Sequence, residues 1–68
     1  MSETKTVREW RDQANYLKGM GDAYTIVAKV GAVSNPTFAY EKAAEHFARG
    51  LCIRMAIAGK AETENVTI

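Results

Sequence analysis

The run from Asn35 to Gly59 constrains the fold of this chain more than any other stretch. It opens with Asn35-Pro36-Thr37, closes with Ala58-Gly59, and carries apolar and small residues at helical spacing. A residue before proline is pushed out of the α region, which suits an asparagine N-cap, and proline itself suits the first helical position. We therefore predict one long helix over this run, ended by Gly59.

A second helical pattern precedes this helix, from residue 6 to about residue 30. Thr6-Val7-Arg8-Glu9 has the form of a capping box, and Gly31 suits the left-handed position that ends a helix. A link of about five residues between two long helices returns the second one antiparallel to the first. The predicted fold class is therefore all-α, an antiparallel two-helix hairpin. Its first helix has an apolar row at steps of three and four, formed by Val7, Trp10, Ala14, Leu17, Gly21, Tyr24 and Ala28.

Gly19 and Gly21 interrupt the first helix. Each glycine costs about 1 kcal/mol relative to alanine in a helix interior. They indicate a kink or break in the helix, or a close crossing where a second backbone approaches, or tolerated glycines near a bend. The sequence leaves these alternatives open.

The second helix has more apolar surface than one hairpin can bury. We predict that Cys52, Ile53 and Ile57 point away from the first helix. The turn from Gly50 to Ile57 is therefore interpreted as a surface for other subunits. The stripe predicted to face the first helix consists of Tyr40, Ala43, Ala44, Phe47, Ala48, Leu51, Met55 and Ala58.

Size and composition favour a homo-oligomer. The 68 residues make one domain, and a chain this short buries only about 60% of the surface that its unfolded form exposes. Apolar residues nevertheless reach 47%. The single cysteine, Cys52, excludes an intramolecular disulfide, and His46 has no second ligand at metal spacing. We expect no metal and no cofactor, so self-association remains as the source of additional burial.

The two ends, 1–5 and 60–68, are expected to be flexible or to act as interface tails. The β-prone end 65–68 is either disordered or adds to a neighbouring subunit. The N-terminus lacks the apolar segment of a signal peptide, and no apolar run reaches about 18 residues, so we expect no membrane partner. The expected location is cytoplasmic, the host cytoplasm if the protein is viral. The net charge of +1 argues against DNA or RNA binding.

The candidate ligand-binding residues form two groups. In the first group, basic side chains bind a phosphate near the open end of the hairpin while Trp10 stacks on a base. The alternative is that Trp10 is a core or interface anchor. In the second, Arg49 and Arg54 line a site between subunits and need an anion; the alternative is ordinary surface arginines. Glu45 lies one turn before Arg49, in the favourable order for an ion pair. The full set is Arg8, Trp10, Arg11, Lys18, Arg49 and Arg54.

No catalytic pattern is present in the sequence. There is no glycine-rich phosphate loop after a strand, no paired carboxylates and no triad. Cys52 is interpreted as a small buried hydrophobe and His46 as an ordinary exposed or interfacial histidine. We predict that the protein is not an enzyme.

The segment Ala44-Glu45-His46-Phe47-Ala48-Arg49-Gly50-Leu51-Cys52, followed by Arg54 and Ala56-Ile57-Ala58, resembles part of a known family. It is similar to the second helix of phage-encoded helical-hairpin proteins, the anti-CBASS cyclic-oligonucleotide sponges and the hairpin domain of Thoeris inhibitors. In that family a glycine in the middle of the helix is flanked by bulky apolar residues, as Gly50 is here. The resemblance implies a homo-oligomer, a hexamer being one arrangement, that holds a cyclic oligonucleotide between protomers.

The leading hypothesis from the sequence is a phage-type immune-evasion protein, an anti-defense sponge. It would oligomerise and sequester a cyclic nucleotide signal without cleaving it. The alternative is a small protein–protein inhibitor or adaptor that docks an apolar helical face on a host protein. A nucleic-acid-binding regulator is disfavoured by the near-zero net charge.

Overall fold

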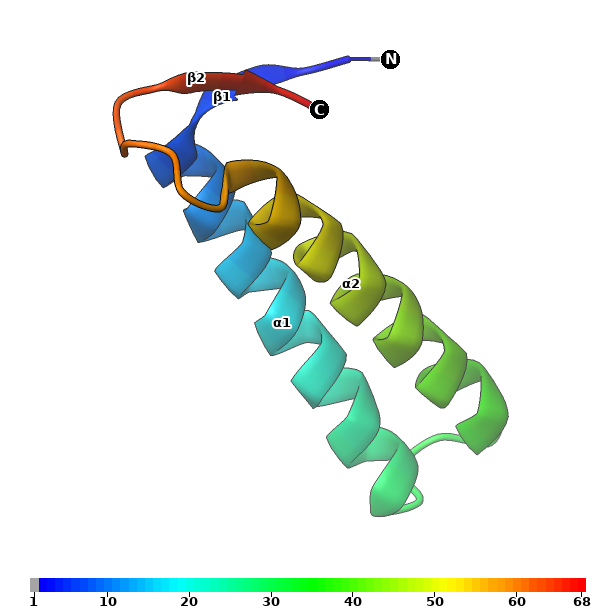
Figure 1. Ribbon diagram of the computed structural model, residues 1–68. Helices are drawn as coiled ribbons and strands as arrows, with labels where there is room; N and C mark the ends of the chain where they lie inside the picture. Colours follow the sequence, from blue (N-terminus) through cyan, green and yellow to red (C-terminus); the bar gives the residue numbers. More distant parts are fainter. Residues whose placement is uncertain (1) are drawn as a thin grey trace.

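The computed structural model describes residues 2–68 and has the element order β1 (Thr4–Thr6), α1 (Val7–Lys29), α2 (Pro36–Ile57) and β2 (Asn65–Thr67). The two helices lie side by side and antiparallel, and the two strands form a small sheet at the end opposite the interhelical turn (Figure 1). The chain is elongated, with extents of 43 × 21 × 14 Å. The predicted helical hairpin is confirmed, and a two-stranded sheet is added to it.

Both helices begin with the caps that the sequence predicts. The Thr6 hydroxyl accepts a hydrogen bond from the Glu9 amide at 3.2 Å, and the Thr6 amide donates to the Glu9 carboxylate at 3.1 Å. That backbone bond, followed by the bond from the Thr6 hydroxyl, lowers the pKa of Glu9. At α2, Asn35 Oδ1 accepts from the Phe38 amide at 3.2 Å, and Pro36 occupies the first turn. The side-chain cap at the start of each helix can therefore be recognised in the local sequence.

Glycines with positive φ follow both helices. Gly31 has φ +71° directly after the C-cap of α1, and Gly59 has φ +75° after the C-cap of α2. Helix α2 ends at Ile57, with Ala58 as its C-cap, two residues before the predicted end. The left-handed conformation of Gly31 and Gly59 favours glycine and turns the chain away from the helix axis.

The row of α1 that faces α2 is the one predicted from its spacing. Its buried residues are Val7, Trp10, Ala14, Leu17, Gly21 and Ala28, and Tyr24 is half-buried between them. The steps of three and four place these residues along one side of the helix. The prediction for this helix face is confirmed.

The face that α2 presents to α1 differs from the prediction. Of the predicted stripe only Ala43 is buried; Ile53 and Ile57, expected to point outward, lie in the core instead. At Gly50 an added Cβ would lie 3.5 Å from the Ala14 carbonyl oxygen. The small residues on this face let the two helices approach closely, which the bulky side chains of the predicted stripe would prevent. The buried residues of α2 are Ala39, Ala43, Gly50, Ile53 and Ile57.

Helix α1 continues without interruption through Gly19 and Gly21, so the expected break is absent, and a kink is not shown. The two glycines have different surroundings. A Cβ at Gly21 would lie 2.7 Å from the Phe47 ring, whereas nothing lies within 4 Å of a Cβ at Gly19. Gly21 thus marks a close crossing, but the group that approaches it is the ring of Phe47 and not a second backbone.

The two chain ends, expected to be flexible or to reach another subunit, pair with each other within the chain. β1 and β2 are antiparallel, with Lys5 opposite Val66. Flanking this pairing, Glu3 and Ile68 exchange two backbone hydrogen bonds of 3.0 and 2.9 Å. The sequence prediction missed this sheet because its two strands have three residues each and are far apart in the chain.

The segment before β2 also caps α1. The first N–H groups of a helix have no partner within the helix. Here the Val7 amide donates to the Glu64 carbonyl at 2.9 Å, and the Arg8 amide donates to the Glu62 carbonyl at 3.2 Å. The C-terminal segment therefore stabilises the start of α1 through its own backbone.

Within residues 2–68, neither helix has a stretch long and apolar enough to cross a membrane.

The two helical glycines generate the first testable prediction. Gly19→Ala gains helix propensity of up to about 1 kcal/mol and meets no atom, so it is expected to stabilise the protein. Gly21→Ala has the same gain but displaces the Phe47 ring, an overpacking cost of roughly 1–3 kcal/mol. Urea unfolding followed by circular dichroism should place the midpoint of Gly21→Ala below that of Gly19→Ala. Equal midpoints would show that Phe47 does not occupy this site.

Candidate functional site

The six predicted ligand-binding residues do not form one site. Trp10 and Arg49 line one cavity, and Lys18 and Arg54 line another. Trp10 is 4% exposed, and its Nε1 donates to the Val66 carbonyl oxygen at 2.8 Å. Lys5 Nζ lies 4.8 Å from the centre of the ring. Trp10 is therefore held in the core beneath β2, and the role of an open stacking platform does not fit this placement. Of the two roles considered for it, the core anchor is the one observed.

Three of the five basic candidates are engaged within the chain. Arg11 binds the Glu62 carboxylate at 2.6 Å, Lys18 binds Asp22 at 3.0 Å, and Arg54 Nη2 donates to Asn15 Oδ1 at 2.8 Å. Arg8, Trp10 and Arg11 lie at the end of the hairpin that the sheet closes, which was expected to be open. Within one protomer, the predicted phosphate-binding side chains therefore do not surround a common site.

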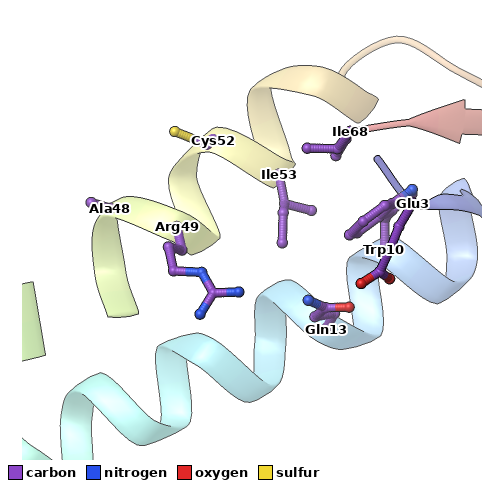
Figure 2. A pocket seen from close by; sticks show the side chains of 8 residues that line it. All are labelled: Glu3, Trp10, Gln13, Ala48, Arg49, Cys52, Ile53 and Ile68. Carbon is purple, nitrogen blue, oxygen red and sulfur yellow. The ribbon is translucent and has the colours of Figure 1, made fainter. Parts of the chain in front are cut away.

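Arg49 has a different environment. The expected pair with Glu45 is replaced, because Glu45 binds Lys42 at 3.3 Å. No hydrogen bond or ion pair joins the Arg49 side chain to any residue within 2–68. Its guanidinium instead extends beside a cavity between the helices (Figure 2).

This cavity has a volume of about 330 Å³ and lies where α1, α2 and the two chain ends meet. Figure 2 shows Trp10 and Ile53 at one part of its wall and the polar side chains of Gln13, Glu3 and Arg49 around the same space. Glu3 and Ile68 were not candidates in the sequence, because only the pairing of the chain ends brings them to this position. The remaining lining residues are Ala48 and Cys52.

A second feature is an apolar row on α2 that flanks the face buried against α1 and contacts α1 at Phe47. We call it the outer seam, and it consists of Tyr40, Ala44, Phe47, Leu51, Met55 and Ala58, at steps of four, three, four, four and three. Its large side chains remain accessible: Tyr40 is 45% exposed, Leu51 59% and Met55 69%. Phe47 is 38% exposed beside Gly21. The outer seam is nearly the stripe that the sequence predicted to face α1.

The interpretation of the whole turn Gly50–Ile57 as a surface for subunits needs correction. Ile53 and Ile57 are buried, at 5% and 8% exposure, and only part of this turn faces outward. Cys52, expected to be buried, is exposed. Either of the two apolar rows on α2 could in principle pack against α1. The row with the smaller residues at its centre is the one that is buried.

His46 has a structural environment. Its Nδ1 lies 2.7 Å from the Lys42 carbonyl oxygen, so this nitrogen carries the proton, and its ring packs against Tyr24 with centroids 5.3 Å apart. No group of three or more histidine, cysteine or acidic side chains is placed to hold a metal ion within the described part of the chain.

Comparison of the chain with family models, with curated proteins and with solved structures gives no match. The resemblance to helical-hairpin sponges therefore stays a prediction from the sequence. Function has to be argued from the two features described above, the cavity and the outer seam.

The contact of Trp10 with β2 generates the second prediction. Deleting residues 65–68 removes the carbonyl partner of Trp10 and the Val66 side chain that packs on the core. We expect a loss of about 1–3 kcal/mol in the free energy of unfolding and a red shift of the tryptophan emission. Thr67→Ala, which removes only an exposed hydroxyl pair with Thr4, is the control and should change stability by less than about 0.5 kcal/mol. Unchanged emission in the deletion would contradict this role of β2.

Proposed function

We propose that this protein acts by non-covalent association, using the outer seam of α2 to bind another helix. The observation that supports the proposal is the continuous helical row of accessible apolar residues on a chain with a small core. Val7 is the largest side chain that is fully buried, whereas Tyr40, Leu51 and Met55 keep 45% to 69% of their surface accessible. Accessible apolar surface of this kind is typical of an interaction site.

The first partner we propose is a second copy of the chain. Pairing two antiparallel seams about a two-fold axis near residue 49 places Tyr40 opposite Ala58 of the second copy. Phe47 then lies opposite Leu51, and Ala44 lies close to Met55. Large residues meet small ones toward both ends, so the row is complementary to itself, as an isologous interface requires. None of its six positions is charged, so the pairing places no like charges opposite each other.

The available area suits a reversible interface. Side chains of this size present roughly 200 Å² each when fully exposed. With the exposed fractions of Tyr40, Phe47, Leu51 and Met55, the large residues contribute about 400 Å² per copy. A stable interface buries about 800 Å² per partner, so the alanines and the flanking side chains must supply the rest. We therefore expect a dimer in reversible equilibrium with the monomer.

The third prediction concerns the mass in solution. The chain of 7.5 kDa is expected to show a mass that rises with concentration in sedimentation equilibrium or light scattering. Leu51→Glu should give a monomer at all concentrations, because it places a charge at the centre of the outer seam. Since Leu51 is 59% exposed, the fold itself should be retained.

Ile26→Glu is the matched control, because Ile26 is 60% exposed on α1 and does not belong to the outer seam. It should leave the mass unchanged. A cross-link checks the register in the same samples: in a Cys52→Ser background, Ala48→Cys lies near the axis and should form a disulfide dimer. Tyr40→Cys should not, because the two copies of that position are about 27 Å apart along the helices. A monomeric wild type, or dissociation by Ile26→Glu alone, would contradict self-association through α2.

If the chain is monomeric but binds another protein through Leu51, the result would favour the alternative hypothesis of an inhibitor or adaptor that docks on a host protein. The proposed chemistry of the surface is the same in both cases. We place the second copy first because the row is complementary to itself.

Sequestration of a cyclic oligonucleotide is the second candidate function, and one observation favours it. Arg49, a candidate from the sequence, has a guanidinium without a carboxylate partner in the described chain and lies at a cavity. A cavity of about 330 Å³ is too small to enclose a cyclic oligonucleotide, so such a ligand would have to lie between copies. Binding of this kind depends on oligomerisation.

The fourth prediction tests this dependence by calorimetry with cyclic di- and trinucleotides at micromolar protein. If the protein is a sponge, the wild type releases or absorbs heat, and both Arg49→Gln and Leu51→Glu weaken binding. The Ile26→Glu variant again serves as the control for an unrelated surface change. The absence of heat with every cyclic nucleotide would eliminate this candidate and leave protein association as the proposed function.

A further inference from the structure

The cavity at the closed end of the hairpin combines apolar walls with hydrogen-bond donors. Trp10, Ile53 and Ile68 supply the large apolar side chains, and each comes from a different part of the fold. Gln13 and Arg49 supply polar groups from the two facing helices (Figure 2). None of the six outer-seam residues lines this cavity, so the argument is independent of self-association.

The free hydrogen-bonding groups at the cavity are donors. Gln13 Oε1 accepts from Lys5 Nζ, which leaves the NH2 group of the Gln13 amide as its free end. Arg49 has five N–H donors and no acceptor, and Glu45, its expected partner, is bound to Lys42. Two donor groups from opposite helices are therefore available to one acceptor.

The charges around the cavity favour an anion. Glu3 has the only acidic side chain of the lining, and Lys5 Nζ pairs with it at a distance of 3.2 Å. The guanidinium of Arg49 then remains as one uncompensated positive charge. Its planar fork of donors matches a carboxylate in two parallel hydrogen bonds.

From this arrangement we infer that the cavity binds a small carboxylate with an apolar body. The carboxylate lies between the guanidinium of Arg49 and the amide of Gln13, and the apolar body lies against Trp10, Ile53 and Ile68. The volume of about 330 Å³ is at the lower end of the range for small-molecule sites, which fits a body of one ring or a short branched chain. A single excess positive charge matches a monoanion better than a phosphate dianion.

The test uses the fluorescence of Trp10, the only tryptophan of the chain, in titrations of the 68-residue chain. The probes are 3-phenylpropionate, its neutral amide 3-phenylpropionamide, and phenyl phosphate. The acid should change the emission in a saturable manner with a dissociation constant in the micromolar to millimolar range. The affinity of the amide should be lower than that of the acid by about tenfold or more, because the amide lacks the charge. Phenyl phosphate should also bind more weakly than the acid.

Arg49→Gln should weaken binding of the acid by about tenfold or more and should remove the preference for the acid over the amide. Arg8→Gln is the matched control, an exposed arginine near the same end that does not line the cavity, and should leave the affinity unchanged. Amide resonances in a ¹⁵N–¹H spectrum verify that both variants fold. Equal affinities for acid and amide, tighter binding of phenyl phosphate, no saturable change, or an unaffected Arg49→Gln variant would each overturn the inference. These results are separate from the mass measurements, so either proposal can fail alone.

Discussion

The contact between Trp10 and the C-terminal segment is the interaction on which the rest of the fold depends. The indole binds the Val66 carbonyl oxygen at 2.8 Å, and the buried ring lies in one cluster with Val7 and Ile53. A chain of this size has little other interior, because the helix pair alone buries mainly alanine and glycine toward the interhelical turn. Closing one end with β2 concentrates the large buried side chains there. The same closure brings Glu3 and Ile68 to the wall of the cavity.

Which apolar residues of α2 stay accessible depends on which face of the helix is buried against α1. Two apolar rows run along this helix; one is buried against α1, and the other contacts α1 at Phe47. The row with Ala39, Ala43 and Gly50 permits close approach of the backbones, and Ile53 and Ile57 fill the space at the closed end. The outer seam, with the bulkier Leu51 and Met55, is left accessible. Dispersion contacts and close packing favour this arrangement over the opposite one.

The two proposed binding surfaces have the same origin. The outer seam is the apolar row that the single partner helix does not cover, and the cavity is the space between the helices where the chain ends enclose it. Arg49 remains available because Lys42 engages Glu45. Both proposals describe binding without covalent chemistry.

The sequence by itself determined the positions of both helices, the caps at Thr6 and Asn35, the glycine after each helix and the inward row of α1. These features depend on neighbouring residues, whose hydrogen bonds and steps of three and four can be recognised locally. It also made Arg49 a candidate ligand-binding residue, but the cavity beside Arg49 could not be predicted from the sequence.

Only the tertiary structure decided which row of α2 is buried, where Trp10 lies and that the two chain ends pair. Spacing alone does not rank two apolar rows on one helix, since the choice depends on how closely the partner backbone can approach at Gly50. The sheet joins Lys5 to Val66, residues near opposite ends of the chain. Its two strands have only three residues each, too few for a clear alternating pattern, and their stability comes from the helices beneath them.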